Sequence, residues 1–251
     1  MLTAHCYPDA AMPEGKTEAL FDAQPYEVDF SAAVVAVRDD LVALDRTLFY
    51  PVGGGQPADT GELTAVAGER IQVIGSHWDE TNRAIIWHRL DHAGALQAGM
   101  QVSGRIDWSM RYRHMKIHTC LHLLCSLIDA PVTGCGIGHE RGRLDFDLPE
   151  MSLSREAITE GLNTLIQRGI DVTTHLVPPT EHDKVLSLVR NKYALPPRSD
   201  NAVKIIQVGD IDIQPCGGTH LRNTAEIGEV VCEKIEKKGR QNRRIVIGFV
   251  N

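Results

Sequence analysis

Two pairs of residues in this sequence could bind one metal ion. His118 and His122 stand four positions apart in a segment of helical pattern, so both imidazoles can lie on the same helix face. Cys216 and His220 form a second pair with the same spacing, and Gly217-Gly218 between them allows a tight turn that lets the pair converge. Together the pairs supply three nitrogens and one sulfur, which is a good donor set for zinc.

Neither pair is decisive alone, because both spacings also arise by chance among core or surface histidines. His114 lies one turn before His118 and could be a ligand or the partner of one, although Arg113 and Lys116 beside it are typical of a basic turn. A zinc protease needs a Glu directly after the first His, and that position is Thr119. An ion here could polarise a water or a carbonyl, or orient an amino acid, and the sequence leaves these open.

A glycine-rich string forms the other distinctive feature. Gly53-Gly54-Gly55-Gln56 lies between Pro51 and Pro57. The string has neither the GK[ST] ending of a P-loop nor the GxGxxG spacing of a dinucleotide-binding turn. Three consecutive glycines predict a sharply bent loop whose backbone can approach another surface closely, although an ordinary turn of a barrel fits the same residues.

The elements that must position these residues change in character near residue 109. Before it, short apolar runs separated by Gly, Asp and Asn predict a small β-barrel or sandwich, while residues 9–25 have little period and are expected to form a loop or arm. The strands expected in this half are 32–37, 41–44, 47–50, 71–74, 84–87 and 102–108. We therefore expect a first domain over residues 1–108, which includes the glycine-rich string.

The second half, residues 109–251, predicts an α+β domain with helices packed against an antiparallel sheet. Apolar residues recur at helical spacing over 110–128 and 158–166, with Ser154 as the N-cap of the second helix, and a third short helix is expected after Thr180. The strands expected here are 144–148, 203–208, 211–213, 230–235 and 245–250, with a hairpin turn at Gly209-Asp210.

Composition and charge exclude several classes of protein. The chain has 251 residues, of which 43% are hydrophobic and 24% charged, which excludes a disordered tail, a collagen-like repeat and a coiled coil. There is no run of 18 apolar residues and no signal-peptide pattern, so we expect a cytoplasmic protein with no membrane partner. The net charge of −7 argues against a general nucleic-acid binder. Residues 1–108 carry 7 basic and 16 acidic side chains, against 19 and 17 in residues 109–251, so a phosphate contact should fall in the second half.

These strings together resemble the alanyl-tRNA editing proteins, free-standing relatives of the editing domain of alanyl-tRNA synthetase that are often called AlaX. Three motifs match in order: residues 45–61 around the glycines, residues 111–124 around the histidine pair, and residues 216–228 around the Cys-His pair. The glycine-rich half resembles the medium-length members, which carry a small β-barrel before the zinc domain. The resemblance therefore implies an α+β fold, with an N-terminal barrel followed by an editing domain of the threonyl/alanyl-tRNA synthetase second-additional-domain type.

The resemblance also implies an activity and a site. Such proteins hydrolyse serine, and sometimes glycine, from wrongly charged tRNA(Ala), so the implied partner is the acceptor end of that tRNA. The family's ligands for one Zn²⁺ fall on His118, His122, Cys216 and His220. The implied catalytic residues are Gln56, in the glycine-rich loop near the editing pocket, and Thr47, which matches a threonine implicated in recognising the serine side chain. Gly54 and Gly55 of the same loop are the implied substrate contacts.

A basic segment near the C-terminus is a candidate for contacting tRNA phosphates. Its candidate residues are Lys237, Lys238, Arg240 and Arg243, and a solvated basic turn would explain the same residues. Arg198 and Asp200 are weaker candidates for the tRNA end. The alternative function is a non-catalytic zinc module that binds tRNA, which a closed four-ligand site would favour. Aminoacylation is excluded because the chain has no room for a catalytic domain and no ATP-binding signature, so no ATP is expected.

Overall fold

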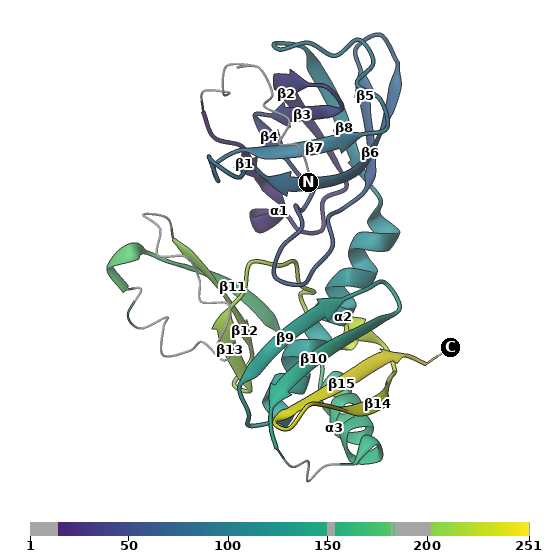
Figure 1. Cartoon of the computed structure of the whole chain (residues 1–251), viewed down its shortest axis with the longest axis vertical. Helices are drawn as coiled ribbons and strands as arrows, with labels where there is room; N and C mark the ends of the chain where they lie inside the picture. Colours follow the sequence, from purple (N-terminus) through teal and green to yellow (C-terminus); the bar gives the residue numbers. More distant parts are fainter. Residues whose placement is uncertain (1–14, 150–153, 182, 184–201, 251) are drawn as a thin grey trace, which may run out of the picture. The chain divides into compact units, whose positions relative to one another are not determined.

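The chain divides into two compact units. The computed structural model describes residues 15–149, 154–181, 183 and 202–250 (Figure 1). The first unit comprises Met1–Val52 and Ala58–Trp108, and the second comprises Gly53–Pro57 and Ser109–Asn251. The glycine-rich segment therefore belongs to the second unit, although chain order had placed it in the first domain. No helix among the described residues is long and apolar enough to cross a membrane.

The first unit is a closed six-stranded barrel in which every neighbouring pair of strands is antiparallel. Its strands are β2 (Asp29–Arg38), β3 (Leu41–Leu44), β5 (Gly61–Ala65), β6 (Arg70–Trp78), β7 (Ile86–Leu90) and β8 (Gln101–Ile106). They follow one another round the barrel in the order β2-β3-β7-β6-β5-β8. The short strands β1 (Glu18–Ala19) and β4 (Arg46–Thr47) pair in parallel beside helix α1 (Leu20–Ala23).

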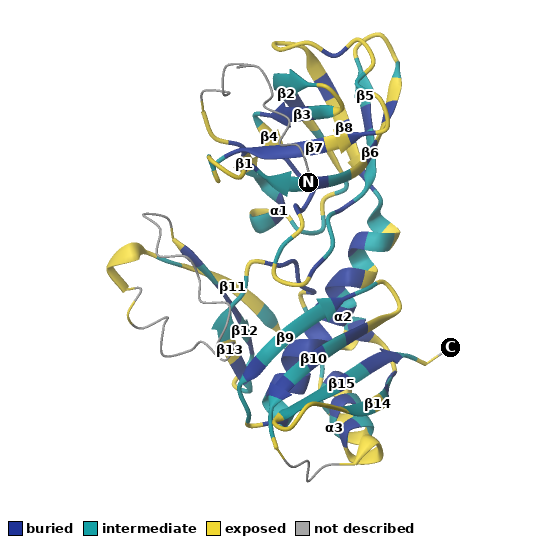
Figure 2. Cartoon of the chain, viewed as in Figure 1, coloured by how far each residue is buried: buried dark blue, intermediate teal, exposed yellow. Residues whose placement is uncertain are grey.

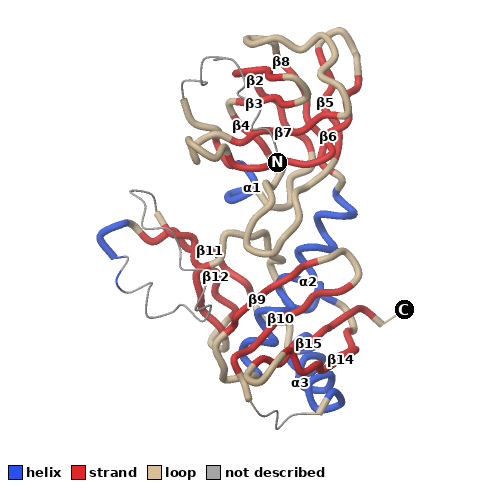
Figure 3. The backbone as a smooth tube through the Cα atoms, viewed as in Figure 1, coloured by secondary structure: helices blue, strands red, loops and turns tan. Residues whose placement is uncertain are grey.

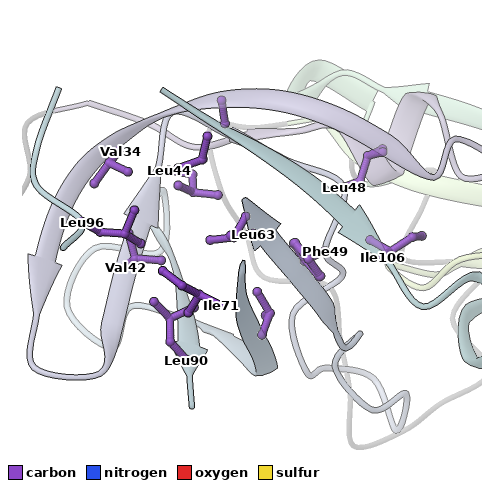
Figure 4. Packing of buried hydrophobic residues seen from close by; sticks show 13 residues of the cluster. Val34, Val42, Leu44, Leu48, Phe49, Leu63, Ile71, Leu90, Leu96 and Ile106 are labelled. Carbon is purple, nitrogen blue, oxygen red and sulfur yellow. The ribbon is translucent and has the colours of Figure 1, made fainter. Parts of the chain in front are cut away.

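The barrel interior is filled by the apolar side chains that alternate along these strands. Residues of β8 alternate between exposed and buried along its whole length, as a half-buried strand requires. Leu63, Ile71 and Phe49 are among the fully buried side chains of this core (Figure 4). Of the two architectures that the sequence allowed for this half, the barrel is the one observed.

The segment expected as a strand at residues 47–50 is only partly one. Strand β4 ends at Thr47, and the following residues are buried outside the strand ladder. Their backbone donors are satisfied by side chains: Phe49 N–H donates to Thr47 Oγ1 (3.0 Å), and Tyr50 N–H donates to Asp59 Oδ2 (2.6 Å). Because these bonds replace a strand partner, the apolar run folds as a buried turn.

A buried histidine fixes the hydroxyl of Thr47 inside the barrel. His88 Nδ1 donates to the carbonyl of Val42 (3.1 Å), so its Nε2 accepts from Thr47 Oγ1 (2.8 Å). Neither side chain is exposed. Burial lowers the pKa of His88 to about 4, so the imidazole stays neutral at physiological pH.

The barrel should lose stability in acid because of His88. The unfolded chain binds a proton near pH 6.5 and the folded barrel only near pH 4, so the stabilisation is complete above pH 6.5 and falls as the pH drops through this window. The shift corresponds to about 3 kcal/mol. Urea unfolding followed by tryptophan fluorescence measures this unit, because Trp78 and Trp87 lie on barrel strands and Trp108 packs against the barrel core. A His88→Gln variant should show a smaller loss, and equal losses in the two proteins would contradict the assignment.

In the residues that the structure describes, the second unit contains two sheets and two α-helices longer than one turn. A four-stranded sheet has the order β14-β15-β10-β9, and a three-stranded sheet has the order β11-β12-β13. The strands are β9 (Val132–Ile137), β10 (Arg141–Asp147), β11 (Val172–Val177), β12 (Val203–Val208), β13 (Asp212–Pro215), β14 (Val230–Lys238) and β15 (Asn242–Phe249). The helices are α2 (Trp108–Leu127) and α3 (Arg155–Gln167), with short 3-10 turns at Pro179–Glu181 and Thr224–Ile227. Figure 3 shows the strands and helices of the described residues.

Helix α2 packs on the larger sheet through a glycine. A Cβ atom at Gly142 on β10 would overlap the side chain of Ile117, so the absence of a side chain lets the helix approach the sheet closely. Buried residues run along α2 and along β10 and β15 (Figure 2). This close packing fixes the rotation of α2 about its axis and thus the direction in which its histidines point.

The predictions for this half are confirmed in part. The helix expected over 110–128 is α2, and the N-cap of α3 is Ser154, whose hydroxyl accepts from Ala157 N–H (3.1 Å). The hairpin at Gly209-Asp210 joins β12 to β13. A 3-10 turn stands where a third helix was expected to begin, and residues 184–201 lie outside the described part. Strands β9 and β11 of this half were not predicted, and neither was β5 of the barrel. The loop or arm expected over residues 9–25 is wrong for its described part, because β1 and α1 lie there and β1 pairs with β4.

Candidate metal centre

Four side chains of the second unit converge to form a candidate metal centre. Helix α2 contributes His118 and His122, and the loop after β13 contributes Cys216 and His220. One ligand atom from each lies within 4.8 Å of all the others. Cys216 Sγ is 3.3 Å from Nε2 of both His118 and His220. A tetrahedral ion with ordinary bond lengths would hold such donors about 3.5 Å apart, so the cluster has the dimensions to hold a metal ion.

The Nδ1 atom of each of the three histidines has a hydrogen-bond partner that holds the imidazole ring in place. Nδ1 of His118 lies 3.0 Å from Gln56 Oε1, and Nδ1 of His122 lies 2.8 Å from Asp212 Oδ2. Nδ1 of His220 lies 3.2 Å from the hydroxyl oxygen of Thr119. These acceptors place the proton on Nδ1, which leaves each Nε2 as a lone-pair donor directed at the cluster.

The electrostatics of the cluster favour the metal-binding protonation state at Cys216 and at His220, but not at His122. Burial alone would raise the pKa of Cys216, but its interactions with the imidazoles of His118 and His220 hold that pKa well below its usual value, which favours the thiolate. Burial and the neighbouring His118 lower the pKa of His220. Burial also opposes a proton on His122, yet hydrogen bonds to Asp212 and Cys216 raise its pKa to about 9. A metal would therefore displace one proton from His122.

The glycine-rich loop is part of this centre. Gly53 and Gln56 exchange two backbone hydrogen bonds across Gly54 and Gly55, which have φ of +57° and +84°, as in a type I′ turn. The carbonyl of Gly55 accepts from Ile137 N–H (2.8 Å), which attaches the loop to the edge of β9. The sharply bent loop that the glycines predicted is confirmed.

The turn places the side-chain amide of Gln56 within hydrogen-bond distance of both His118 and Thr219. Its Oε1 accepts from His118 Nδ1 and from Thr219 N–H (3.1 Å), and its Nε2 donates to Thr219 Oγ1 (2.9 Å). Gln56 is almost wholly buried. In the structure it therefore orients a ligand and ties the glycine-rich loop to the loop of Cys216 and His220.

The remaining candidate residues lie outside the four-donor cluster. Thr47 belongs to the barrel, where His88 and Phe49 are its partners. His114 is buried but is not one of the four donors. Arg198 and Asp200 fall outside the described residues.

The basic residues near the C-terminus are divided between the two faces of a hairpin. Lys237 is paired in register with Arg243, whereas Lys238 is paired with Asn242, so the two lysines point to opposite faces. Arg240 is exposed in the turn. Lys238 forms an ion pair with Glu236 (3.2 Å), and Arg243 donates to the carbonyl of Pro149. The four cations therefore do not form a single patch.

Two of the three acceptors that orient the ligands, Asp212 and Thr119, were not predicted from the sequence. Asp212 and Gln214 alternate on β13 just before Cys216, so the three share one face of the strand. Gln214 Nε2 also donates to Asp212 Oδ2 (3.0 Å), which strengthens the partner of His122. Polar residues at every second position before a cysteine ligand are the signal that could have identified them. No comparable signal marks Thr119.

Two family models relate this barrel and the unit with the three-histidine, one-cysteine centre to the aminoacyl-tRNA synthetases. The family model described as "Threonyl and Alanyl tRNA synthetase second additional domain" matches residues 203–246. The model described as "tRNA synthetases class II (A)" matches residues 6–110. These matches cover the metal-site loop with its following strands, and the first unit.

Full-length relatives give the family. An alanyl-tRNA editing protein AlaX-M of Saccharolobus solfataricus is 36% identical over 233 residues, which is 91% of this chain and 97% of that protein. The AlaX-M protein of Methanosarcina barkeri is 36% identical over 94% of this chain and 100% of its own. An alanine–tRNA ligase of Sulfurisphaera tokodaii is 33% identical, with 88% of this chain matching 25% of the ligase. The chain belongs to the AlaX-M family of alanyl-tRNA editing proteins.

Proposed function

We propose that this protein is a zinc-dependent hydrolase that acts in trans on tRNA(Ala) and removes wrongly attached serine, with Gly-tRNA(Ala) as a second substrate. The observation that carries the proposal is the four-donor cluster bound to the glycine-rich loop through Gln56. Membership of the AlaX-M family and the names of the relatives, which are alanyl-tRNA editing proteins, support the editing activity. The substrate places the activity in the cytoplasm, and ester hydrolysis requires no ATP.

The donor set fits zinc. One thiolate and three neutral imidazoles are typical zinc ligands, and each imidazole has a hydrogen-bond acceptor on its second nitrogen. A zinc ion held by His118, His122, Cys216 and His220 would act as a Lewis acid toward a water, a carbonyl oxygen or the amino acid. Gln56, Asp212 and Thr119 hold the ligand rings in the orientation that such an ion needs.

The proposed reaction adds water to the ester carbonyl that joins the amino acid to the terminal ribose. The ribose oxygen leaves with a proton, and the products are free serine and uncharged tRNA(Ala). A synthetase pocket that accepts alanine cannot strongly reject an analogue with one added hydroxyl, so a second hydrolytic site improves accuracy. Such a site can select serine by a hydrogen bond that alanine cannot make.

Thr47 stays our candidate for recognising the serine hydroxyl. Its own hydroxyl donates to His88 and accepts from Phe49 N–H, so it can take one further hydrogen bond, as an acceptor.

Among the basic residues, Lys237 and Arg240 are the exposed candidates for phosphate contacts that have no acidic group within ion-pair distance among the described residues. Lys238 and Arg243 already have protein partners, and we keep them as weaker members of the same surface.

The second candidate function is a non-catalytic zinc module that holds tRNA(Ala). A specific observation favours it: the cluster supplies four protein donors, whereas catalytic zinc usually keeps one position for water or substrate. The two functions differ in whether the ester is cleaved, and a hydrolysis assay separates them.

The test is to incubate the protein with tRNA(Ala) charged with serine, glycine or alanine and to follow the loss of each ester. We expect rapid release of serine, slower release of glycine, and alanine spared by at least about tenfold. Protein stripped by a chelator should be inactive and should recover with Zn²⁺, and Cys216→Ala should stay inactive. Metal-loaded protein that binds tRNA(Ala) but cleaves none of these esters would support the non-catalytic module instead.

A further inference from the structure

A further polar side chain of the second unit, Cys135, borders the metal centre without being one of its donors. The register of the larger sheet pairs Cys135 on β9 with Leu144 on β10, whose side chain is buried. The same register pairs Ile137 with Gly142, the glycine that packs against α2. Cys135 therefore lies on the sheet face that α2 covers, and α2 is the helix that carries His118 and His122.

The glycine-rich loop fixes Cys135 from the other side. A Cβ atom at Gly55 would lie 3.0 Å from both the sulfur and the carbonyl oxygen of Cys135, so the turn packs directly on this residue. The next residue, Gln56, bonds to His118. Cys135 is thus held between the edge of the sheet and the loop that orients a metal ligand.

The accessible side of the cluster is the side of Cys216. The three histidines are buried and have acceptors on their Nδ1 atoms, whereas Cys216 is the one ligand residue that is partly exposed. Cys135 is also partly exposed, and it lies near enough to Cys216 for the two side chains to interact electrostatically. Burial raises the pKa of Cys135 to about 12, so its thiol keeps its proton and remains a weak hydrogen-bond donor.

We infer that the Cys135 thiol forms the part of the pocket wall against which the aminoacyl side chain lies, and that it favours serine over glycine. The inference rests on the proposed function. An ester that reaches the metal from its accessible side must place its small side chain next to the groups on that side. The thiol is small enough to leave room for the CH₂OH group of serine and can donate a hydrogen bond to the hydroxyl oxygen of that group. Glycine has no side-chain oxygen, so it cannot form this hydrogen bond.

The test compares the ratio of kcat/KM for Ser-tRNA(Ala) to that for Gly-tRNA(Ala) in four proteins. Cys135→Ala removes the donor and should lower the ratio about fivefold, the effect of one weak hydrogen bond. Cys135→Val adds a branch that crowds a serine more than a glycine, and should lower it about tenfold. Cys135→Ser keeps a donor of similar size and should stay within about twofold of the wild type. All four proteins should bind one zinc per chain.

Cys232→Ala is the matched control. Cys232 is a buried cysteine of the same sheet, on β14 at the opposite edge from β9. Its truncation should leave the ratio unchanged even if it lowers the melting temperature, which separates specificity from stability. Ratios within twofold of the wild type in both Cys135→Ala and Cys135→Val would overturn the inference while the proposed function stood. Wild-type protein that cleaves neither ester would overturn the proposed function and the inference with it.

Discussion

Replacing Gly218 with alanine is expected to weaken zinc binding by about 100-fold. A Cβ atom at this position would lie 2.8 Å from Gln56 Oε1 and would overlap the imidazole ring of His118. The ring cannot retreat without leaving Gln56 or turning its Nε2 away from the cluster. The loop cannot retreat freely either, because Lys204 Nζ donates to the carbonyl of Gly218 (2.9 Å). Overpacking of this kind costs about 1–3 kcal/mol, and the upper end corresponds to about 100-fold in affinity.

The neighbouring glycine provides a matched control. A Cβ atom at Gly217 would have no atom within 4 Å, and its φ is not in the left-handed region. Gly217→Ala should therefore bind zinc like the wild type in a competition titration against a chromophoric chelator. Deacylation of Ser-tRNA(Ala) should fall in parallel with zinc affinity in Gly218→Ala only. Equal zinc affinities in the two variants would show that Gly218 does not pack on His118.

The parts of the fold that could be predicted from sequence are those in which hydrophobic period and turn residues agree. Helix α2 has apolar residues at helical spacing along its length, and the β12–β13 hairpin places Gly209 at a φ of +49° between two apolar runs. In both, the local sequence and the buried face demand the same structure.

The missed elements lack that agreement. Strand β11 is exposed or only partly buried along its whole length, so no apolar alternation marks it, and its pairing with β12 is what makes it a strand. Strand β9 carries Gly134, Cys135 and Gly136 where strand formers would be expected. A Cβ at Gly134 would meet the carboxylate of Asp145, and one at Gly136 would meet the side chain of Arg143. These glycines follow from tertiary packing that a single sequence does not display.

In the candidate site, the metal donors could be predicted from the sequence, whereas the hydrogen bonds that orient them could not. Residue type and spacing marked all four donors, because HxxxH and CxxxH are local patterns. The acceptors are not local to their ligands: Asp212 bonds to His122 across 90 positions, and Gln56 bonds to His118 across 62. The resemblance identified Gln56 as a site residue, but its role in orienting His118 came only from the structure. Contacts between distant segments therefore limit what the sequence can predict about this centre.

Asp212→Ala is expected to lower zinc affinity by about 10- to 100-fold, the usual range for the loss of a partner behind a metal ligand. The variant removes the carboxylate oxygen that accepts hydrogen bonds from His122 Nδ1–H and from Gln214 Nε2. Without the carboxylate, His122 should also lose the hydrogen bond that raises its pKa to about 9. The imidazole resonances of metal-free protein should therefore titrate at lower pH in this variant.

Asp210→Ala is the control for this prediction, because Asp210 lies two residues earlier, in the turn before β13, and has an exposed side chain 3.9 Å from Arg168. It should bind zinc as the wild type does. Asp212→Asn separates charge from hydrogen bonding, since its amide oxygen can still accept from His122. An affinity close to the wild type in Asp212→Asn would assign the effect to ring orientation, and an affinity close to Asp212→Ala would assign it to the negative charge. Wild-type affinity in Asp212→Ala would show that the ring of His122 is held by the packing of α2 alone.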